Sequence, residues 1–209
     1  MDKLLQRSAD FEKLVVEMLM FPPYDNSARI KLSRTMCSIA IEHAESAKIL
    51  LAAGNFTSSH GLLRLQFEAL VRALWFFYAA PDLTVEMCSA DLTTETEKTA
   101  QKLPMLSNML EIMEGKAPQN ALDPLLEFKE YSWKPLNSFV HGGLHAIDRH
   151  SKGYPEAMLE QTLRVSNGVS GVTGYFLAIL TGNSKLAKDF HNSFSEYKDC
   201  LPQYRKNNS

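Results

Sequence analysis

The chain has 209 residues, of which 45% are hydrophobic and 22% are charged, and its formal net charge is −2 at pH 7. This length is sufficient for one domain with a substantial core that needs neither a metal nor a disulfide. The small net charge argues against a surface that binds nucleic acid along its whole length, although it leaves room for a local basic pocket.

Three cysteines, none of them in a CxxC pair, are typical of free thiols in a reducing compartment. The N-terminal residues alternate charged and apolar side chains and lack the uninterrupted apolar run of a signal peptide. Residues 165–184 are uncharged over about the length of a membrane span, but their first half is rich in Gly, Ser, Thr and Asn. We therefore expect a buried or interface helix there, no membrane association and a cytoplasmic location.

Apolar residues recur at helical period along every long segment, and no hairpin signal separates them. The first predicted helix covers residues 3–20. The second covers residues 27–53, with Ser27 as its N-cap and Gly54 just beyond its end. The third covers residues 59–79.

After a short helix and a polar stretch at residues 91–102, the helical pattern continues to residue 200. Pro124 is expected in the first turn of one helix, and Pro135 is expected to interrupt or kink that helix before Gly142 ends it. The architecture predicted is an all-α, irregular helical bundle that forms a single domain over residues 1–209, with a polar tail from about 201. The later predicted helices cover residues 83–90, 104–114, 123–141, 155–180 and 184–200.

Arg64, Glu68 and Arg72 follow one another at four-residue spacing inside the most apolar stretch of the chain, and we call them the charged stripe. Residues four apart share a helix face, and ions on a buried face cost several kcal/mol each unless they are paired. One interpretation is an internal salt-bridge network with Glu42, His43 or Glu45 on the second helix. In the other, two arginines around one glutamate leave a positive excess that attracts a phosphate or another anion.

A second group of polar residues surrounds His141, which is predicted in the last turn of its helix. The helix dipole there favours the imidazolium form, which could act as a general acid near neutral pH. Asn137 and Ser138 can share the face of His141, and Lys134 lies two turns back on the same side. These groups could perform acid/base chemistry on a phosphodiester, or His141 could simply cap the helix before Gly142.

A metal site is a third interpretation, because HGGLHAIDRH brings His141, His145, Asp148 and His150 together in sequence. The two glycines should break the helix between the first two histidines, and no HExxH or ExxH pattern occurs. We therefore expect no native metal and no cofactor, and we rank a metal-dependent hydrolase last.

The helix predicted from residue 155 carries Gly168, Gly171, Gly174 and Ala178, several of which lie on one face. Such small residues allow another backbone to approach closely, at a cost of about 0.5–1 kcal/mol per glycine relative to alanine. The close crossing could be internal, or it could be the seam of a symmetric dimer.

The charged stripe, followed by Asn137, Ser138 and His141-Gly142, resembles a group of uncharacterised bacterial helical proteins. These look like distant relatives of the HEPN superfamily (higher eukaryotes and prokaryotes nucleotide-binding domains), and the resemblance covers roughly residues 27–141. It implies an all-α bundle that often dimerises and acts as a metal-independent ribonuclease, toxin or phage-defence effector, or else binds nucleotides or serves as a scaffold. The ribonuclease members use an Arg followed four to six residues later by His. Here Asn137 stands near the position of that Arg.

The first functional hypothesis is a HEPN-like homodimer in which His141, Asn137 and Ser138 face a pocket lined by Arg64 and Arg72. That pocket would bind RNA or a nucleotide, and in an enzyme His141 would be the acid/base while an arginine stabilises charge on phosphorus. The alternative is a non-enzymatic interaction or scaffold module of a toxin–antitoxin or defence system, in which the charged stripe is internal. The second alternative is the metal-dependent hydrolase.

Overall fold

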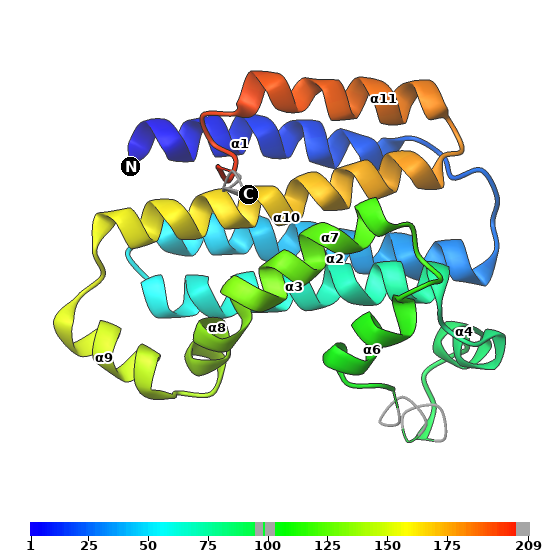
Figure 1. Cartoon of the computed structure of the whole chain (residues 1–209), viewed down its shortest axis with the longest axis horizontal. Coiled ribbons are helices and arrows are strands. Elements are labelled where there is room, and N and C mark those ends of the chain that lie inside the picture. The colour runs from blue at the N-terminus through cyan, green and yellow to red at the C-terminus, as the bar shows by residue number, and fades with distance from the viewer. Residues whose placement is uncertain (95–97, 99–102, 204–209) are drawn as a thin grey trace.

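A computed structural model of the protein describes residues 1–94, 98 and 103–203, and these residues form helices and loops without a strand (Figure 1). The all-α bundle predicted from the sequence is confirmed. Residues 95–97 and 99–102 of the predicted polar stretch, and residues 204–209 of the predicted tail, lie outside the described residues. The elements, in chain order, are α1 (Asp2–Glu17), the 3-10 turn η1 (Met18–Met20), α2 (Ala28–Ala52), α3 (Phe56–Tyr78), α4 (Asp82–Ser89), α6 (Leu106–Met113), α7 (Gln119–Tyr131), α8 (Trp133–Val140), α9 (Leu144–Lys152), α10 (Glu156–Leu180), α11 (Ser184–Ser193) and the 3-10 turn η2 (Phe194–Tyr197).

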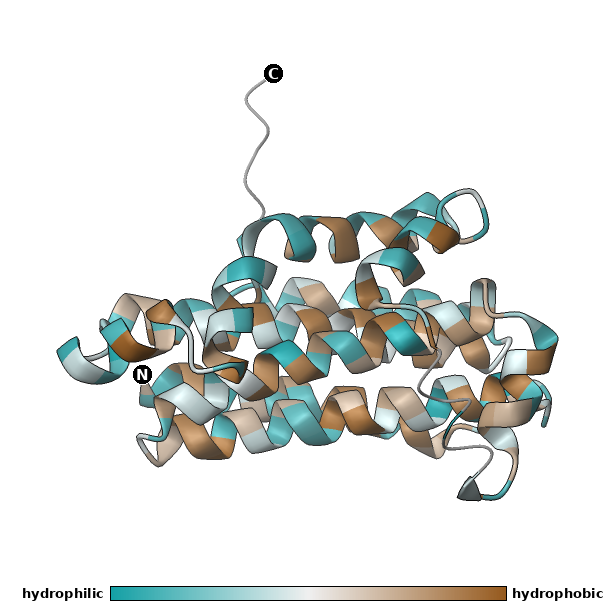
Figure 2. Ribbon diagram, turned by 90° about the horizontal axis from the view of Figure 1, so that it is seen from below, coloured by the Kyte–Doolittle hydropathy of each residue, from teal (hydrophilic) through white to brown (hydrophobic). Residues whose placement is uncertain are grey.

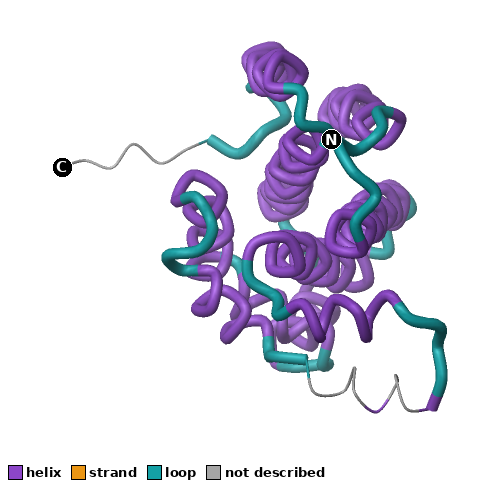
Figure 3. The backbone as a smooth tube through the Cα atoms, turned by 90° about the vertical axis from the view of Figure 1, so that its right-hand side faces the viewer, coloured by secondary structure: helices purple, strands orange, loops and turns teal. Residues whose placement is uncertain are grey.

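The long helix α10 is the centre of the bundle. It contacts α1 and α11 on one side and the α2–α3 pair on the other (Figure 1). The shorter helices α6, α7 and α8 follow on the outer side of α3, and α9 leads back to α10 (Figure 1). Seen nearly end-on, the long helices lie side by side around a common interior (Figure 3).

Helices α2 and α3 form a long hairpin whose ends match the sequence signals closely. The Ser27 hydroxyl caps α2 by accepting from the N–H of Ile30, as predicted. At the other end Gly54 has φ +79°, a conformation that favours glycine, and the N–H of Asn55 donates to the carbonyl of Leu50. Helix α3 begins at Phe56, three residues before the predicted start, so the turn is tighter than the sequence indicated.

The core is filled mainly from α3, which is apolar around most of its circumference. Phe67, Leu70 and Trp75 are almost completely buried. The hydropathy of the other helices alternates around each axis, as expected for helices with one face on the core (Figure 2). No described helix is both long enough and apolar enough to cross a membrane.

The glycine face of α10 is covered from within the same chain. A Cβ at Gly174 would overlap the ring of Phe190 on α11, and one at Gly168 would lie 2.7 Å from Pro202. Gly171 faces Phe194 in the same way, at 3.2 Å. Of the two alternatives left by the sequence, the structure therefore shows the internal crossing, and this face has no room for a second copy.

Two predicted boundaries near prolines are wrong. Helix α7 begins after Pro118, so Pro124 lies inside the helix and costs it one backbone hydrogen bond instead of starting it. The expected interruption lies at Ser132, between α7 and α8, and not at Pro135. Pro135 falls in the first turn of α8, where its missing N–H would have had no partner within the helix.

Helix α9 was not predicted, because the two glycines indicated only the end of the preceding helix. Gly142 has φ +63°, which turns the chain, and Gly143 then becomes the N-cap of α9. Basic residues lie in the last turn of α9, where their positive charges interact favourably with the negative end of the helix dipole. Gly153, with φ +92°, ends the helix.

Candidate functional site

The Arg64 guanidinium joins α3 to α8. Its Nη1 lies 2.6 Å from Oε1 of Glu68, and its Nε donates to Oδ1 of Asn137 at 2.7 Å. Its flat face lies over the Trp133 ring, with Cζ 3.3 Å from the ring centroid. Arg64 is only 8% exposed. The charged stripe and the second polar motif of the sequence therefore meet at this residue.

The position of α8 follows from the spacing of its own side chains. Trp133 and Asn137 are four residues apart and share the face that contacts Arg64. Phe67 of α3 stacks on Phe128 of α7, with ring centroids 3.9 Å apart, and meets Trp133 edge-on at 5.7 Å. Aromatic packing thus fixes the break between α7 and α8 over α3, and Arg64 and Asn137 form the polar contact beside it.

The charged stripe runs from a buried end to an exposed end. The side chain of Glu68 is 20% exposed, and its second oxygen lies 3.6 Å from Nη1 of Arg72, whose side chain is 34% exposed. Burial lowers the pKa of Arg64, and the nearby Glu68 carboxylate opposes this shift. Because Glu68 is shared between two arginines, the stripe carries one net positive charge.

The partners expected for the stripe on α2 are absent from these contacts, since the polar partner comes from α8. The buried ion of α2 is Lys48, whose Nζ lies 2.5 Å from a Glu12 oxygen of α1. Burial lowers the pKa of Lys48 and raises that of Glu12. The sequence contained a signal for this pair, because Lys48 lies on the apolar face of α2 with Ala44 and Leu51.

The residues predicted to be catalytic have different structural roles. His141 is the C-cap of α8 and is exposed, as is Lys134. Asn137 faces inward and accepts from Arg64. The Ser138 hydroxyl accepts from the N–H of His145 at 2.9 Å and so caps the start of α9.

His141 and Arg72 lie toward opposite ends of α3. A Cβ at Gly61 would lie 4.0 Å from Val140, the neighbour of His141, so this end of α8 sits over the beginning of α3. Arg72 is eleven positions further along the helix, which is a rise of about 16 Å. The structure therefore brings Arg64 to Asn137, but it does not bring Arg72 to His141 as one shared pocket would require.

His60, one turn before Arg64, belongs to the core. Its Nδ1 donates to the carbonyl of Phe56 at 2.7 Å, and its Nε2 lies 2.9 Å from the Thr162 hydroxyl of α10. The rings of Phe139 and Tyr154 lie 4.6 and 5.3 Å from its own. Burial lowers its pKa, so the neutral ring is favoured. The Thr162 hydroxyl can then donate its one proton either to Nε2 or to the Met158 carbonyl, which lies 2.8 Å away.

Among residues 1–94, 98 and 103–203, no group of three His, Cys, Asp or Glu side chains lies close enough to hold a metal ion. Within HGGLHAIDRH, Asp148 pairs with Lys152 at 2.5 Å and with Arg149 at 3.5 Å. Nδ1 of His150 lies 3.2 Å from the Thr57 hydroxyl. The described part of the chain therefore contains no ligand set for the metal-dependent alternative.

Replacing Glu68 should destabilise the protein, because two arginines, one of them buried, would lose the one carboxylate that pairs with them among the described residues. For Glu68→Ala we expect the free energy of unfolding to fall by about 2–3 kcal/mol, less than for a fully buried pair because Glu68 is partly exposed. Glu42→Ala, at an exposed position of α2, is the control and should cost less than about 0.5 kcal/mol. Urea denaturation measures both, and equal losses would contradict the role of the stripe.

The lowered pKa of His60 predicts a pH dependence of stability. An unfolded histidine binds a proton near pH 6.5 while folded His60 does not, so stability is complete above that pH and falls as the pH drops toward the folded pKa. Between pH 7.5 and 5.5 the free energy of unfolding should decrease less steeply in His60→Gln than in the wild type, with His43→Gln of α2 as the control. Denaturation curves at each pH measure this, and identical slopes for the wild type and His60→Gln would refute it.

No curated protein sequence and no solved structure is significantly similar to the chain. One family model, described as a family of unknown function (DUF6988), matches residues 37–203 and so includes both the charged stripe and α8. This match contains no link to the HEPN superfamily, and that resemblance stays a prediction. Because the match covers most of the chain, the protein belongs to the DUF6988 family.

Proposed function

We propose that this protein is a HEPN-like cytoplasmic protein that binds a phosphate group of RNA or of a nucleotide at the C-terminal end of α8, around His141. The observation that supports this most is the hydrogen bond between Arg64 and Asn137, which joins the two sequence motifs of the resemblance in one place. His141, one turn beyond Asn137, is the exposed residue that we assign to contact the phosphate.

Three features around His141 favour an anion. Asn137 uses its oxygen to accept from Arg64, which leaves the N–H groups of Nδ2 without an acceptor among the described residues. His141 also lies beside the first turn of α9, and the N–H groups at a helix N-terminus attract negative charge. Lys134, two turns before His141 on α8, adds an exposed positive charge on the same side.

The arrangement supports binding more directly than cleavage. Metal-independent cleavage needs a general acid and a donor that stabilises charge on phosphorus. Arg64 is buried and already contacts Glu68, Asn137 and Trp133, and the Ser138 hydroxyl caps α9. A ribonuclease built on His141 would therefore need a further group, which a second copy of the chain could supply.

We further propose that the chain forms a homodimer through an apolar corner consisting of Val140, Leu144 and Ile147. Leu144 is 80% exposed and Ile147 is 61% exposed, and both lie on α9 close to His141. Helix α9 carries Asp148 as well as Arg149 and Lys152, so a two-fold contact would place opposite charges across the seam. In the alternative, a non-enzymatic module of a toxin–antitoxin or defence system, the same corner would contact a different protein.

The binding proposal predicts that His141→Ala weakens RNA binding by about fivefold, the effect of losing one exposed contact to a phosphate. A labelled single-stranded RNA and its mononucleotide would be titrated at about 50 mM salt, where phosphate contacts are least screened. His43→Ala on α2 is the matched control and should bind as the wild type does. Gel analysis of the same mixtures reports cleavage, and products that require His141 would make the protein a ribonuclease. Absence of saturable binding by the wild type, or equal binding by all three proteins, would rule out the site.

The dimer proposal predicts that Leu144→Glu dissociates the protein into monomers. The acidic side chain is compatible with the first turn of α9, so the fold should persist. Leu83→Glu is the control, because Leu83 is 67% exposed on α4 and lies outside the corner. Light scattering after gel filtration measures the mass. A monomeric wild type, or dissociation by both substitutions, would contradict a dimer at this corner.

A further inference from the structure

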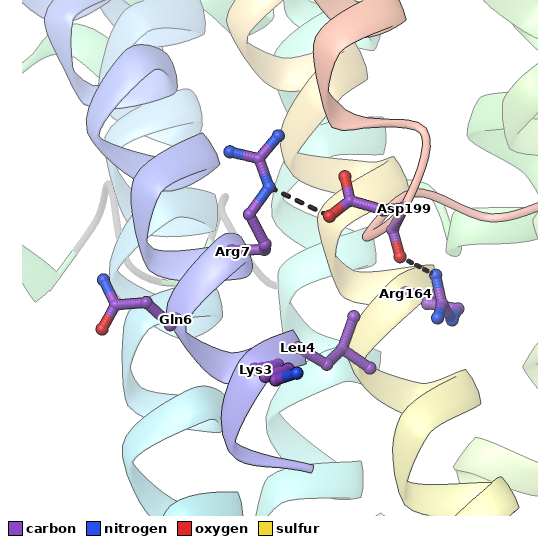
Figure 4. Close-up of a pocket in the computed structure, with 6 residues that line it drawn as sticks. All are labelled: Lys3, Leu4, Gln6, Arg7, Arg164 and Asp199. Carbon is purple, nitrogen blue, oxygen red and sulfur yellow. Dashed lines mark hydrogen bonds and ion pairs between the residues drawn. The ribbon is translucent and has the colours of Figure 1, made fainter.

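A hollow of about 470 Å³ lies between the start of α1, the middle of α10 and the C-terminal segment after η2 (Figure 4). Its lining contains none of the residues of α3, α8 or α9 discussed above, so it is independent of the proposed function. Three of the six lining side chains are basic and one is acidic, which leaves two net positive charges. The lining residues are Lys3, Leu4, Gln6, Arg7, Arg164 and Asp199.

The two arginines are held in place by the C-terminal segment. Nε of Arg7 donates to Oδ2 of Asp199 at 3.0 Å, and its Nη2 donates to the carbonyl of Glu196. The guanidinium also lies over the Tyr197 ring, 4.5 Å from its centroid. Nη1 of Arg164 donates to the carbonyl of Asp199 from the opposite side (Figure 4).

These bonds leave several N–H donors of the two guanidinium groups unused. Nη1 of Arg7 and Nη2 of Arg164 take part in none of them, although each guanidinium offers five N–H groups. The Lys3 ammonium has no ion-pair or hydrogen-bond partner among the described residues. Only the Asp199 carboxylate offsets these charges within the lining, and one of its oxygens already accepts from Arg7.

The C-terminal segment that supplies these partners is itself firmly attached. The buried amide of Asn167 donates to the carbonyl of Cys200 at 2.8 Å and to the Ser8 hydroxyl at 2.7 Å. Pro202 packs against Gly168, where a side chain would not fit. The two arginines therefore face the hollow from fixed positions, so a ligand would lose little free energy in ordering them.

The size and exposure of the hollow define the ligand class. Its volume is in the range of sites for small organic molecules. Its cations are partly exposed, so each single ion pair is screened and weak, and useful affinity requires several contacts at once. Arginine forks match the oxygens of phosphate groups better than point charges do. We propose that the hollow binds a small molecule carrying a diphosphate or two phosphate groups.

Titration calorimetry with inorganic pyrophosphate at constant ionic strength tests this proposal. The wild type should show saturable binding, and Lys3→Gln should weaken it by about fivefold. Lys185→Gln is the matched control, because Lys185 is also an exposed lysine in the first turn of a helix without a partner among the described residues. Arg164→Gln should weaken binding as well, and its thermal melt shows whether the C-terminal segment stays attached.

Binding that Lys3→Gln and Arg164→Gln weaken while Lys185→Gln leaves it unchanged would support the site. Lack of saturable binding by the wild type, or equal weakening by Lys3→Gln and Lys185→Gln, would overturn it. If His141→Ala weakens pyrophosphate binding and Lys3→Gln does not, the anion binds at α8 and the hollow is not a site. Failure at the hollow leaves the RNA experiment with His141→Ala unaffected.

Discussion

The burial of one guanidinium determines much of this architecture. Arg64 lies on a helix that is apolar around most of its circumference, so its charge must be compensated within the protein. Glu68 supplies the counter-charge from the same helix, and Asn137 and Trp133 supply a hydrogen bond and an aromatic face from α8. Helix α8 is short, and its position is specified by these contacts to Arg64 together with the aromatic packing around Phe67. The positions of α9 and of His141 follow from it.

Buried polar groups that need hydrogen-bond partners also determine the contact between α3 and α10. Thr162, Ser166 and Ser170 recur every four residues on α10 and so form one stripe. The first faces His60, and the other two exchange hydrogen bonds with the fully buried amide of Gln66. An axial slip between the helices would leave these groups unsatisfied in the core, which costs more than the loss of equivalent apolar contacts. The polar residues of α3 therefore specify its register against α10 and α8 at once.

The sequence was informative where local chemistry decides the outcome and uninformative where distant segments meet. The cap at Ser27 and the turn at Gly54 depend on neighbouring backbone, and both were predicted. That Arg64 needed a partner followed from the apolar residues around it. The HEPN-like hypothesis placed Asn137 beside Arg64, but no local pattern indicated this contact, because it spans 73 positions. Helix α9 was missed because the two glycines before it indicated the end of one helix and not the start of another. The hollow was missed because Arg7, Arg164 and Asp199 come from three segments far apart in the chain.

The cations of this protein fall into two classes, buried and exposed, which differ in their capacity to bind an anion. Arg64 and Lys48 are buried and each is paired with a carboxylate, and their charges stabilise helix contacts. Arg164 is anchored by a backbone carbonyl, which holds a guanidinium in place without neutralising it, and Arg7 is anchored by a carbonyl together with the exposed Asp199 carboxylate. An anion can reach only the second class at low cost, because displacing Glu68 would strand a carboxylate beside the core. Any phosphate ligand of this protein should therefore be recognised by exposed groups, such as His141 or the arginines of the hollow, while the charged stripe remains structural.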